Sequence, residues 1–434
     1  MKRAILILCL FIGFGLSALP VRAQESPAPA LTLNVPAAAV AANDPAAATR
    51  AWLDTVPPDK RARSDAYFEG GYWLLLWDFL LAAAISIFLL QSRISARLRD
   101  IAEGITRFKW LQVWLYALPF VLISAILTFP LTVYESFVRE HQYGMATQTF
   151  GPWFGEQVIG LIVALVFLPV LLVVLYWVFR AAPKSWWIWG TVVVAVFSMI
   201  GSFILPVFVL PLFNKYKPIN DSSIRDPILA MARANEIPVD QVYEFDASRQ
   251  TKRISANVAG FLGTTRIALN DNLLKRCTLP EIRQVMAHEM GHYVLNHGVK
   301  LTIYSSLFFF AGFLITRVFF DKVLHRWGGG WGVRDIADPA GLPLLMLIIG
   351  VYSLLLTPIQ NSSVRITERE ADAFGINTSR EPDGFAAVSL KLGEYRKLDP
   401  GKWEEIIFFD HPSGRARIRM AMDWKAAHLP SGNP

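Results

Sequence analysis

The chain has few cysteines, and this limits the kinds of stabilisation and metal binding open to it. Only two of its 434 residues are cysteines. Cys9 lies in an apolar N-terminal run and Cys277 stands alone, which excludes a disulfide framework and a zinc site built from thiolates. Histidine is also scarce, at seven residues. A metal site in this chain would therefore use histidine and carboxylate side chains.

Charged residues are also few: they make up 18% of the chain, whereas apolar residues make up 53%. Such a composition is too apolar for a soluble protein unless the apolar residues are grouped. They form six runs, each long enough for a membrane helix of about 20 residues: 72–90, 110–133, 158–179, 186–210, 302–320 and 342–359. The net charge of +7 needs no nucleic-acid partner, because Lys and Arg gather at the cytoplasmic ends of membrane helices. We expect a multi-pass integral membrane protein whose apolar helices lie in the lipid bilayer.

The N-terminal segment resembles a secretory signal peptide over residues 1–23. Lys2 and Arg3 precede about sixteen apolar residues, and Val21-Arg22-Ala23 fits a cleavage site. A short uncleaved first span is the alternative, since the run falls just below about 17 residues. Residues 24–50, rich in alanine and proline, are predicted to be a flexible tether, and residues 24–71 as a whole form the tether and the lead-in to the first span.

The polar stretches predict where the soluble part of the protein lies. Four spans within 72–212 precede the first polar stretch, 213–300, and two spans within 301–360 separate it from the second, 361–434. Both stretches therefore lie on the same face of the membrane and can build one site. The short loops 91–109 and 180–184 are basic, so the positive-inside bias predicts that they are cytoplasmic. The two polar stretches are then on the opposite side, which is the periplasmic side of a bacterial inner membrane or the equivalent side of a plasma membrane.

The first polar stretch contains the sequence VMAHEMGHYVLNH. Thr278 followed by Glu281 predicts the start of a helix with a capping box. On this helix His288 and His292 are four residues apart, so both imidazoles share one face, as two ligands of a tetrahedral zinc ion require. Glu289 adjoins the first histidine and can reach a metal-bound water, which is the general-base arrangement of H-E-x-x-H.

A third ligand is needed to complete such a site. His297 is close in sequence but would point away on a continuous helix, so it is predicted to cap the helix end. The second polar stretch has Glu368 and Asp372 on one helical face, where one carboxylate can bind metal and the other can bond the free nitrogen of a liganding histidine. Glu370 is rotated away and is predicted to be solvated. The alternative is a charged helix face without function.

Three motifs together, H-E-M-G-H, the E-x-x-x-D that begins at Glu368, and HPSGRARI, resemble the integral-membrane zinc peptidases of the CAAX prenyl protease 1 type. The resemblance implies that His288, His292 and Glu368 hold one Zn2+ ion. It implies that Glu289 is the catalytic base and that Asp372 is the hydrogen-bond partner of His288.

Two further segments follow the same resemblance. In SANVAGFLGTTRIALND, it implies that Asn257 lies on an edge strand along the substrate backbone, although Val258 stands where the family pattern has alanine. In HPSGRARI, it implies that His411 and Arg417 face the active site, where a donor stabilises the oxyanion of the transition state. The alternatives are a loop histidine held by Pro412 and an arginine on a basic surface helix.

The expected fold is a predominantly α-helical multi-pass membrane protein with a small α+β zincin-like catalytic domain. QVYEFDA alternates as a strand does, so a small sheet should flank the H-E-x-x-H helix, and its edge can pair with an extended peptide. The expected function is a zinc metalloendopeptidase acting on polypeptides, including membrane or lipidated proteins. A zinc-bound scaffold or transporter-like protein without turnover is the alternative, which would not need Glu289.

Overall fold

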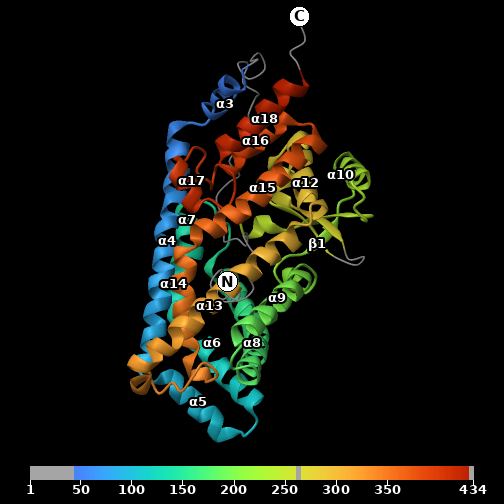
Figure 1. Cartoon of the computed structure of the whole chain (residues 1–434). Helices are drawn as coiled ribbons and strands as arrows, with labels where there is room; N and C mark the ends of the chain where they lie inside the picture. The colour runs from blue at the N-terminus through green and yellow to red at the C-terminus, as the bar shows by residue number, and fades with distance from the viewer. Residues whose placement is uncertain (1–43, 261–264, 430–434) are drawn as a thin grey trace, which may run out of the picture.

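The computed structural model of the protein describes residues 44–260 and 265–429, and the predicted signal peptide lies outside them. In Figure 1, long helices fill one end of the molecule, whereas shorter helices and a small sheet form the other. The predicted fold class, mainly helical with a small sheet, is confirmed. The long helices are α4 (Pro58–Gln91), α6 (Lys109–Val133), α8 (Phe150–Ala181), α9 (Trp186–Ile204), α13 (His297–Trp331) and α14 (Leu342–Leu355).

The long helices correspond to the six predicted membrane spans. Four of them are long and apolar enough to cross a bilayer, and the number in the described chain is six if each of two bent helix pairs counts as one span. One pair joins α14 to α15 (Thr357–Ser379) at an angle of 62°. Pro358 stands in the first turn of α15, where it cannot continue the hydrogen-bond ladder of the preceding helix. The second pair bends by 42° within the segment that follows Trp186.

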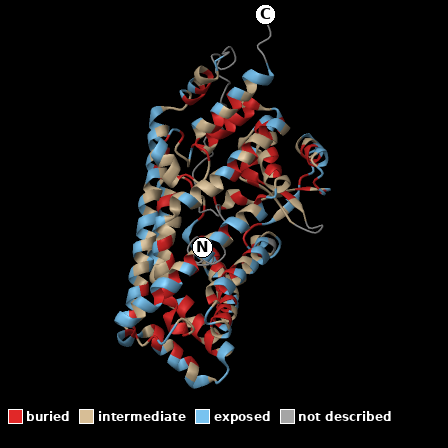
Figure 2. Cartoon of the chain, viewed as in Figure 1, coloured by how far each residue is buried: buried red, intermediate tan, exposed pale blue. Residues whose placement is uncertain are grey.

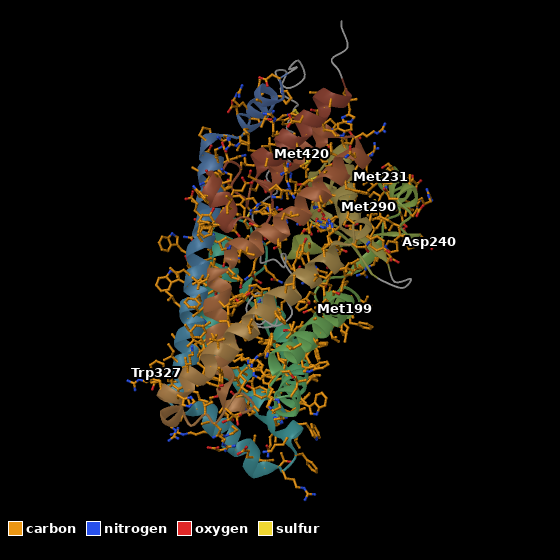
Figure 3. All side chains as sticks on the ribbon, in the orientation of Figure 1. Met199, Met231, Asp240, Met290, Trp327 and Met420 are labelled. Atoms are coloured by element: carbon orange, nitrogen blue, oxygen red, sulfur yellow. The ribbon has the colours of Figure 1, made fainter. Side chains whose placement is uncertain are left out.

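Many large apolar residues of these helices are exposed, and Figure 2 colours the exposed positions along the helices pale blue. Ile126 is 69% exposed and Trp177 62% exposed. Trp327 projects from the end of α13, whereas Met290 lies inside the opposite end of the molecule (Figure 3). Apolar patches of this extent suit a lipid environment rather than water. The amphipathic helix α5 (Ile94–Ile105) joins α4 to α6 at the end remote from the sheet.

The prediction of a flexible tether over residues 24–50 was wrong for residues 45–50, which are helical. Helix α3 (Pro45–Leu53) begins after Asp44, whose side chain accepts a 2.8 Å hydrogen bond from the amide of Ala46. Trp52 is completely buried and belongs to the same core as Met286 and Ile418. The Asp-Pro pair is a helix-start signal, and an alanine-rich composition is also that of a good helix. Residues 24–43 lie outside the described part.

The small sheet has the strand order β1-β2-β4-β3. Its strands are β1 (Tyr216–Pro218), β2 (Val242–Phe245), β3 (Ala256–Ala259) and β4 (Arg266–Asn270). β2 and β4 are parallel, and the outer strands pair antiparallel to them. The strand expected in QVYEFDA and the strand expected at Asn257 are both present, whereas β1 was not predicted. Asn257 pairs with Ala268 on one side only, because β3 is at the edge.

The two polar stretches pack into one unit around a shared core. The first contributes α10 (Ser222–Ala234), α11 (Asp271–Arg276) and α12 (Leu279–Val294). The second contributes the polar part of α15 with α16 (Pro382–Leu392), α17 (Lys402–Phe408) and α18 (Gly414–His428). Met286, Met290 and Ile418 are completely buried between them. The structure thus places both stretches at the same end of the molecule. This agrees with the two membrane spans predicted between them, which return the chain to the side of the membrane from which it entered.

Helices α12 and α15 approach each other closely at two glycines. A Cβ atom on Gly291 would lie 3.2 Å from the Cα atom of Ala371, and one on Gly375 would lie 3.0 Å from the backbone nitrogen of His288. Backbone atoms cannot move aside as the end of a flexible side chain can. The glycines therefore set the separation of the two helices, and with it the distance between their functional side chains.

Candidate metal centre

Helix α12 begins as the sequence predicts and holds its two histidines on one face. The amide of Thr278 donates to the carboxylate of Glu281 at 2.6 Å, which closes the capping box. Lys391 of α16 donates to the same carboxylate at 2.7 Å, so the helix start is tied to the core. The Nε2 atoms of His288 and His292 lie 3.1 Å apart. Two imidazole nitrogens can face each other at this distance when both are turned toward one shared cation.

Glu368 of α15 faces both histidines. Its Oε2 atom is 3.4 Å from Nε2 of His288, and its Oε1 atom is 3.4 Å from Nε2 of His292. Donors at about 2.0–2.2 Å from a tetrahedral zinc ion are about 3.3–3.5 Å from one another. The separations of 3.1 to 3.4 Å fit such an ion. In the described part of the chain, these three residues form the group of His, Cys, Asp and Glu close enough to share one metal.

Asp372 and Arg417 lie behind the donor atoms. Nδ1 of His288 donates to Asp372 at 2.8 Å, which turns Nε2 toward the centre. Arg417 of α18 donates from Nε to Asp372 at 2.8 Å and from Nη2 to Glu368 at 3.1 Å. Although burial opposes its charge, these carboxylates raise the pKa of Arg417 above its usual value. The alternative of a surface position is wrong for Arg417, because it is only 6% exposed.

The prediction that His297 caps the helix end was wrong. Its Nδ1 atom lies 2.9 Å from Nδ1 of His292, and its Nε2 atom lies 2.9 Å from Glu370. Lys300 donates to the same carboxylate at 2.6 Å. The helix-wheel angle assumed one continuous helix, but α12 ends at Val294 and α13 begins at His297. Glu370 is 41% exposed on its side chain, yet it is held by these two partners rather than only by water.

The chain reverses between the two helices at Asn296, which has a φ of 54°. Asparagine is the residue, after glycine, that most readily takes this left-handed conformation at a helix end. Asn296 was therefore the residue in the sequence that indicated an end of α12 before His297. Because the next helix starts one residue later, its first side chain turns back toward His292.

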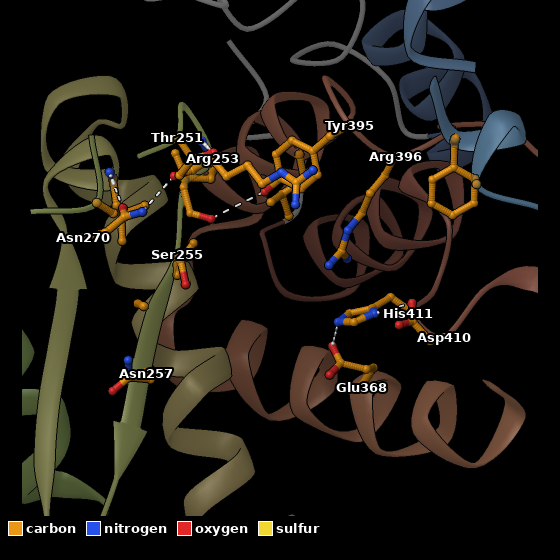
Figure 4. Close-up of a pocket in the computed structure, with 18 of the residues that line it drawn as sticks. Thr251, Arg253, Ser255, Asn257, Asn270, Glu368, Tyr395, Arg396, Asp410 and His411 are labelled. Atoms are coloured by element: carbon orange, nitrogen blue, oxygen red, sulfur yellow. Dashed lines mark hydrogen bonds and ion pairs between the residues drawn. The ribbon is translucent and has the colours of Figure 1, made fainter. Parts of the chain in front are cut away.

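Glu289 and His411 line a cavity of about 800 Å³ that adjoins the donor atoms. Burial raises the pKa of the Glu289 carboxyl above its usual range, as a base that must take up a proton near neutral pH requires. Nε2 of His411 lies 3.2 Å from Glu368, and its Nδ1 lies 2.7 Å from Asp410 (Figure 4). Asn257 lies on β3 across the cavity.

Comparison with known proteins covers almost the whole described chain. Residues 42–215 match a model described as the CAAX prenyl protease N-terminal region with five membrane helices, and residues 218–425 match peptidase family M48. An uncharacterised metalloprotease of Bacillus subtilis, YhfN, is 30% identical over 371 residues, which cover 84% of this chain and 86% of YhfN. The chain belongs to peptidase family M48. It is thus a membrane-embedded zinc metalloendopeptidase by family, as its sequence motifs indicate.

Other members of the M48 family extend the comparison to eukaryotes. CAAX prenyl protease 1 of Saccharomyces cerevisiae is 28% identical over 317 residues, which cover 70% of each chain. The human CAAX prenyl protease 1 homologue is 24% identical and covers 70% of this chain and 71% of its own. The crystal structure of Ste24p from S. mikatae has a TM-score of 0.70 at 20% identity, over 85% of this chain and 90% of that one. This chain therefore shares its fold with that solved structure.

Proposed function

We propose that His288, His292 and Glu368 hold one catalytic Zn2+ ion. The observation that carries this proposal is the convergence of three donor atoms from two helices at separations of 3.1 to 3.4 Å. Three protein donors leave the fourth tetrahedral position for water or substrate, as in catalytic zinc sites, whereas structural sites use four. When bound, the ion activates the attacking water and polarises the scissile carbonyl.

The surrounding residues supply the proton transfers and the orientation of the substrate. Glu289 takes the proton of the attacking water and then gives it to the leaving amine. His411, whose Nδ1 is held by Asp410, directs Nε2 toward the centre and can donate to the developing oxyanion. Arg417 already donates to the carboxylates of α15, so it supports the metal ligands rather than the oxyanion. Asn257 lies on the edge strand, where an extended peptide can pair with the backbone.

The substrate is a polypeptide that reaches the site through the cavity. The cavity is lined by Phe68, Tyr72 and Leu75 of the membrane helix α4 as well as by the catalytic residues. A segment drawn from a membrane or exported protein could enter from this side, which favours quality-control cleavage as the biological role. Cleavage of prenylated CAAX sequences, for which several relatives are named, is proposed as a further activity. A zinc-bound scaffold without turnover is the competing function.

Removal and return of the metal test the proposed function directly. The full-length protein in detergent should cleave a quenched fluorescent peptide, and a chelator should abolish this cleavage. Zn2+ at stoichiometric amounts should restore it, because the ligand set of two histidines and one carboxylate suits zinc. Metal analysis should give one zinc per chain. A protein that binds zinc but cleaves no peptide would support the scaffold instead.

We expect His297→Ala to weaken zinc binding by about 10- to 100-fold, the usual cost of losing a hydrogen-bond partner of a liganding histidine. If Nε2 of His292 faces the metal, its Nδ1–H donates to His297, whose own Nε2–H donates to Glu370. Competition with a fluorescent zinc chelator measures the affinity. His325→Ala is the matched control, since His325 is exposed and bonds only the backbone of its own helix in the described chain. Equal affinities in both variants would contradict the assigned role.

Gly375→Ala should also weaken zinc binding, because its Cβ atom would meet the backbone of His288 at 3.0 Å. Helix α15 must then move away from α12, and Glu368 moves with it. Gly155→Ala makes the same change in α8, where nothing lies within 4 Å of the new methyl group. Zinc titration of both variants provides the comparison. An unchanged affinity in Gly375→Ala would show that helix separation does not control the site.

A further inference from the structure

Four arginines line the cavity beside the proposed metal centre. Three of them have acceptors for their guanidinium groups: Arg139 donates to the carbonyl of Tyr67, Arg253 donates to Glu140 at 2.9 Å, and Arg417 donates to the two carboxylates of α15. These three hold parts of the protein together. Their N–H groups are therefore engaged before any substrate arrives.

Arg396, in the segment between α16 and α17, has no such acceptor. None of its nitrogens has a hydrogen-bond or ion-pair partner within residues 44–260 and 265–429, and its Nη1 atom is buried. Arg396 lines the cavity, and its side chain points toward His411 (Figure 4). A charged donor withdrawn from water without an acceptor is unfavourable, and folded proteins contain few of them. An unpartnered arginine in a cavity wall therefore points to an anionic ligand.

Asp410, an acid of the same wall whose carboxylate feels the charge of Arg396, is already hydrogen-bonded. Asp410 accepts a 2.7 Å hydrogen bond from His411. Burial raises the pKa of Asp410, but the charge and hydrogen bond of His411 together with the charge of Arg396 lower it to about 2. Asp410 thus remains ionised and attracts Arg396 without filling its hydrogen bonds.

The position of Arg396 places its ligand next to the reacting bond. In Figure 4 its side chain reaches toward His411, on the opposite side of the cavity from the strand that carries Asn257. Glu368, a proposed metal ligand, lies directly below His411. A peptide that pairs with β3 and crosses the metal centre would therefore continue toward Arg396.

We propose that Arg396 binds a carboxylate of the peptide substrate close to the scissile bond. This inference rests on the proposed peptidase function and defines a preference within it. A guanidinium group forms two parallel hydrogen bonds to a carboxylate, which fixes its orientation as well as its charge. The carboxylate can be the C-terminal group of the substrate or the side chain of an aspartate or glutamate.

The test compares Arg396→Gln with the wild-type protein on four forms of one quenched fluorescent peptide. The peptide has a free or amidated C-terminus, combined with Glu or Gln beside the scissile bond. We expect wild-type kcat/KM to be about 10- to 100-fold higher for one carboxylate-bearing form, the range for a charge-assisted pair of hydrogen bonds. Arg396→Gln should remove that preference while cleaving the neutral peptide within about threefold of wild type. The form that loses its advantage identifies the source of the carboxylate.

Two further variants separate recognition from folding. Arg396→Lys keeps the charge without the paired donors and should retain part of the preference. Arg415→Gln removes an exposed arginine that pairs with Asp399 at 2.7 Å and should leave the preference intact. Wild-type protein that cleaves all four peptides equally would overturn this proposal and leave the peptidase function standing. Wild-type protein that cleaves none of them would overturn both.

Discussion

Glu289→Gln should abolish peptide cleavage while leaving one zinc ion bound per chain. The amide has nearly the same shape as the carboxylate but cannot accept a proton from the attacking water. General-base catalysis contributes about 10²- to 10⁴-fold to such reactions. The kcat of the variant should therefore fall by about 100-fold or more. Because Glu289 is not one of the three converging donors, the metal should stay. Peptide cleavage and metal analysis on the same preparation measure both outcomes.

The retention of zinc distinguishes this variant from one that merely misfolds. Glu244→Gln is a suitable control, because Glu244 lies on β2 and pairs with the exposed Lys217 at 3.3 Å. It should match the wild-type protein in both measurements. If Glu289→Gln kept full activity with zinc bound, the scaffold reading would also fail, and another residue would have to be the base. If it lost activity together with zinc but kept the melting temperature of the wild-type protein, Glu289 would be a ligand.

The local parts of the site could be predicted because they depend on helix periodicity. Four-residue spacing puts His288 and His292 on one face, and the same rule pairs Glu368 with Asp372. The distance between the two helices could not be predicted, since it depends on Gly291 and Gly375 meeting backbone atoms of the opposite helix. Tertiary packing of this kind has no signature within a single segment.

Residues whose partners come from other segments were the ones misjudged. His297 was placed by extending the periodicity of α12 beyond its true end, so its contact with His292 was missed. Trp52, in the predicted lead-in to the first span, had no predicted contact, although it is completely buried in the core of the catalytic unit. The membrane helices, by contrast, were found from hydropathy alone, because lipid requires a continuous apolar run. Long-range polar contacts and short amphipathic helices carry no comparably strong pattern.

Glu368→Ala should lose zinc, with an affinity reduced by more than the roughly 100-fold limit for residues that only support a ligand. The substitution removes one of three donors and leaves two neutral imidazoles. It also deprives Arg417 of one of its two carboxylates, so some loss of thermal stability should accompany the loss of metal. Zinc content after dialysis, the melting temperature in detergent and peptide cleavage should all decrease together.

Glu370→Ala is the informative comparison, because Glu370 lies on the same helix two residues away and bonds His297 rather than the donor cluster. This variant should keep zinc at stoichiometric concentrations, with a modest decrease in affinity transmitted through His297 and His292. A double variant with His297→Ala should then be no weaker than His297→Ala alone, since both substitutions break the same chain of hydrogen bonds. Loss of zinc in Glu370→Ala with retention in Glu368→Ala would reverse the ligand assignment. The third ligand would then lie on the other face of α15, next to Lys300.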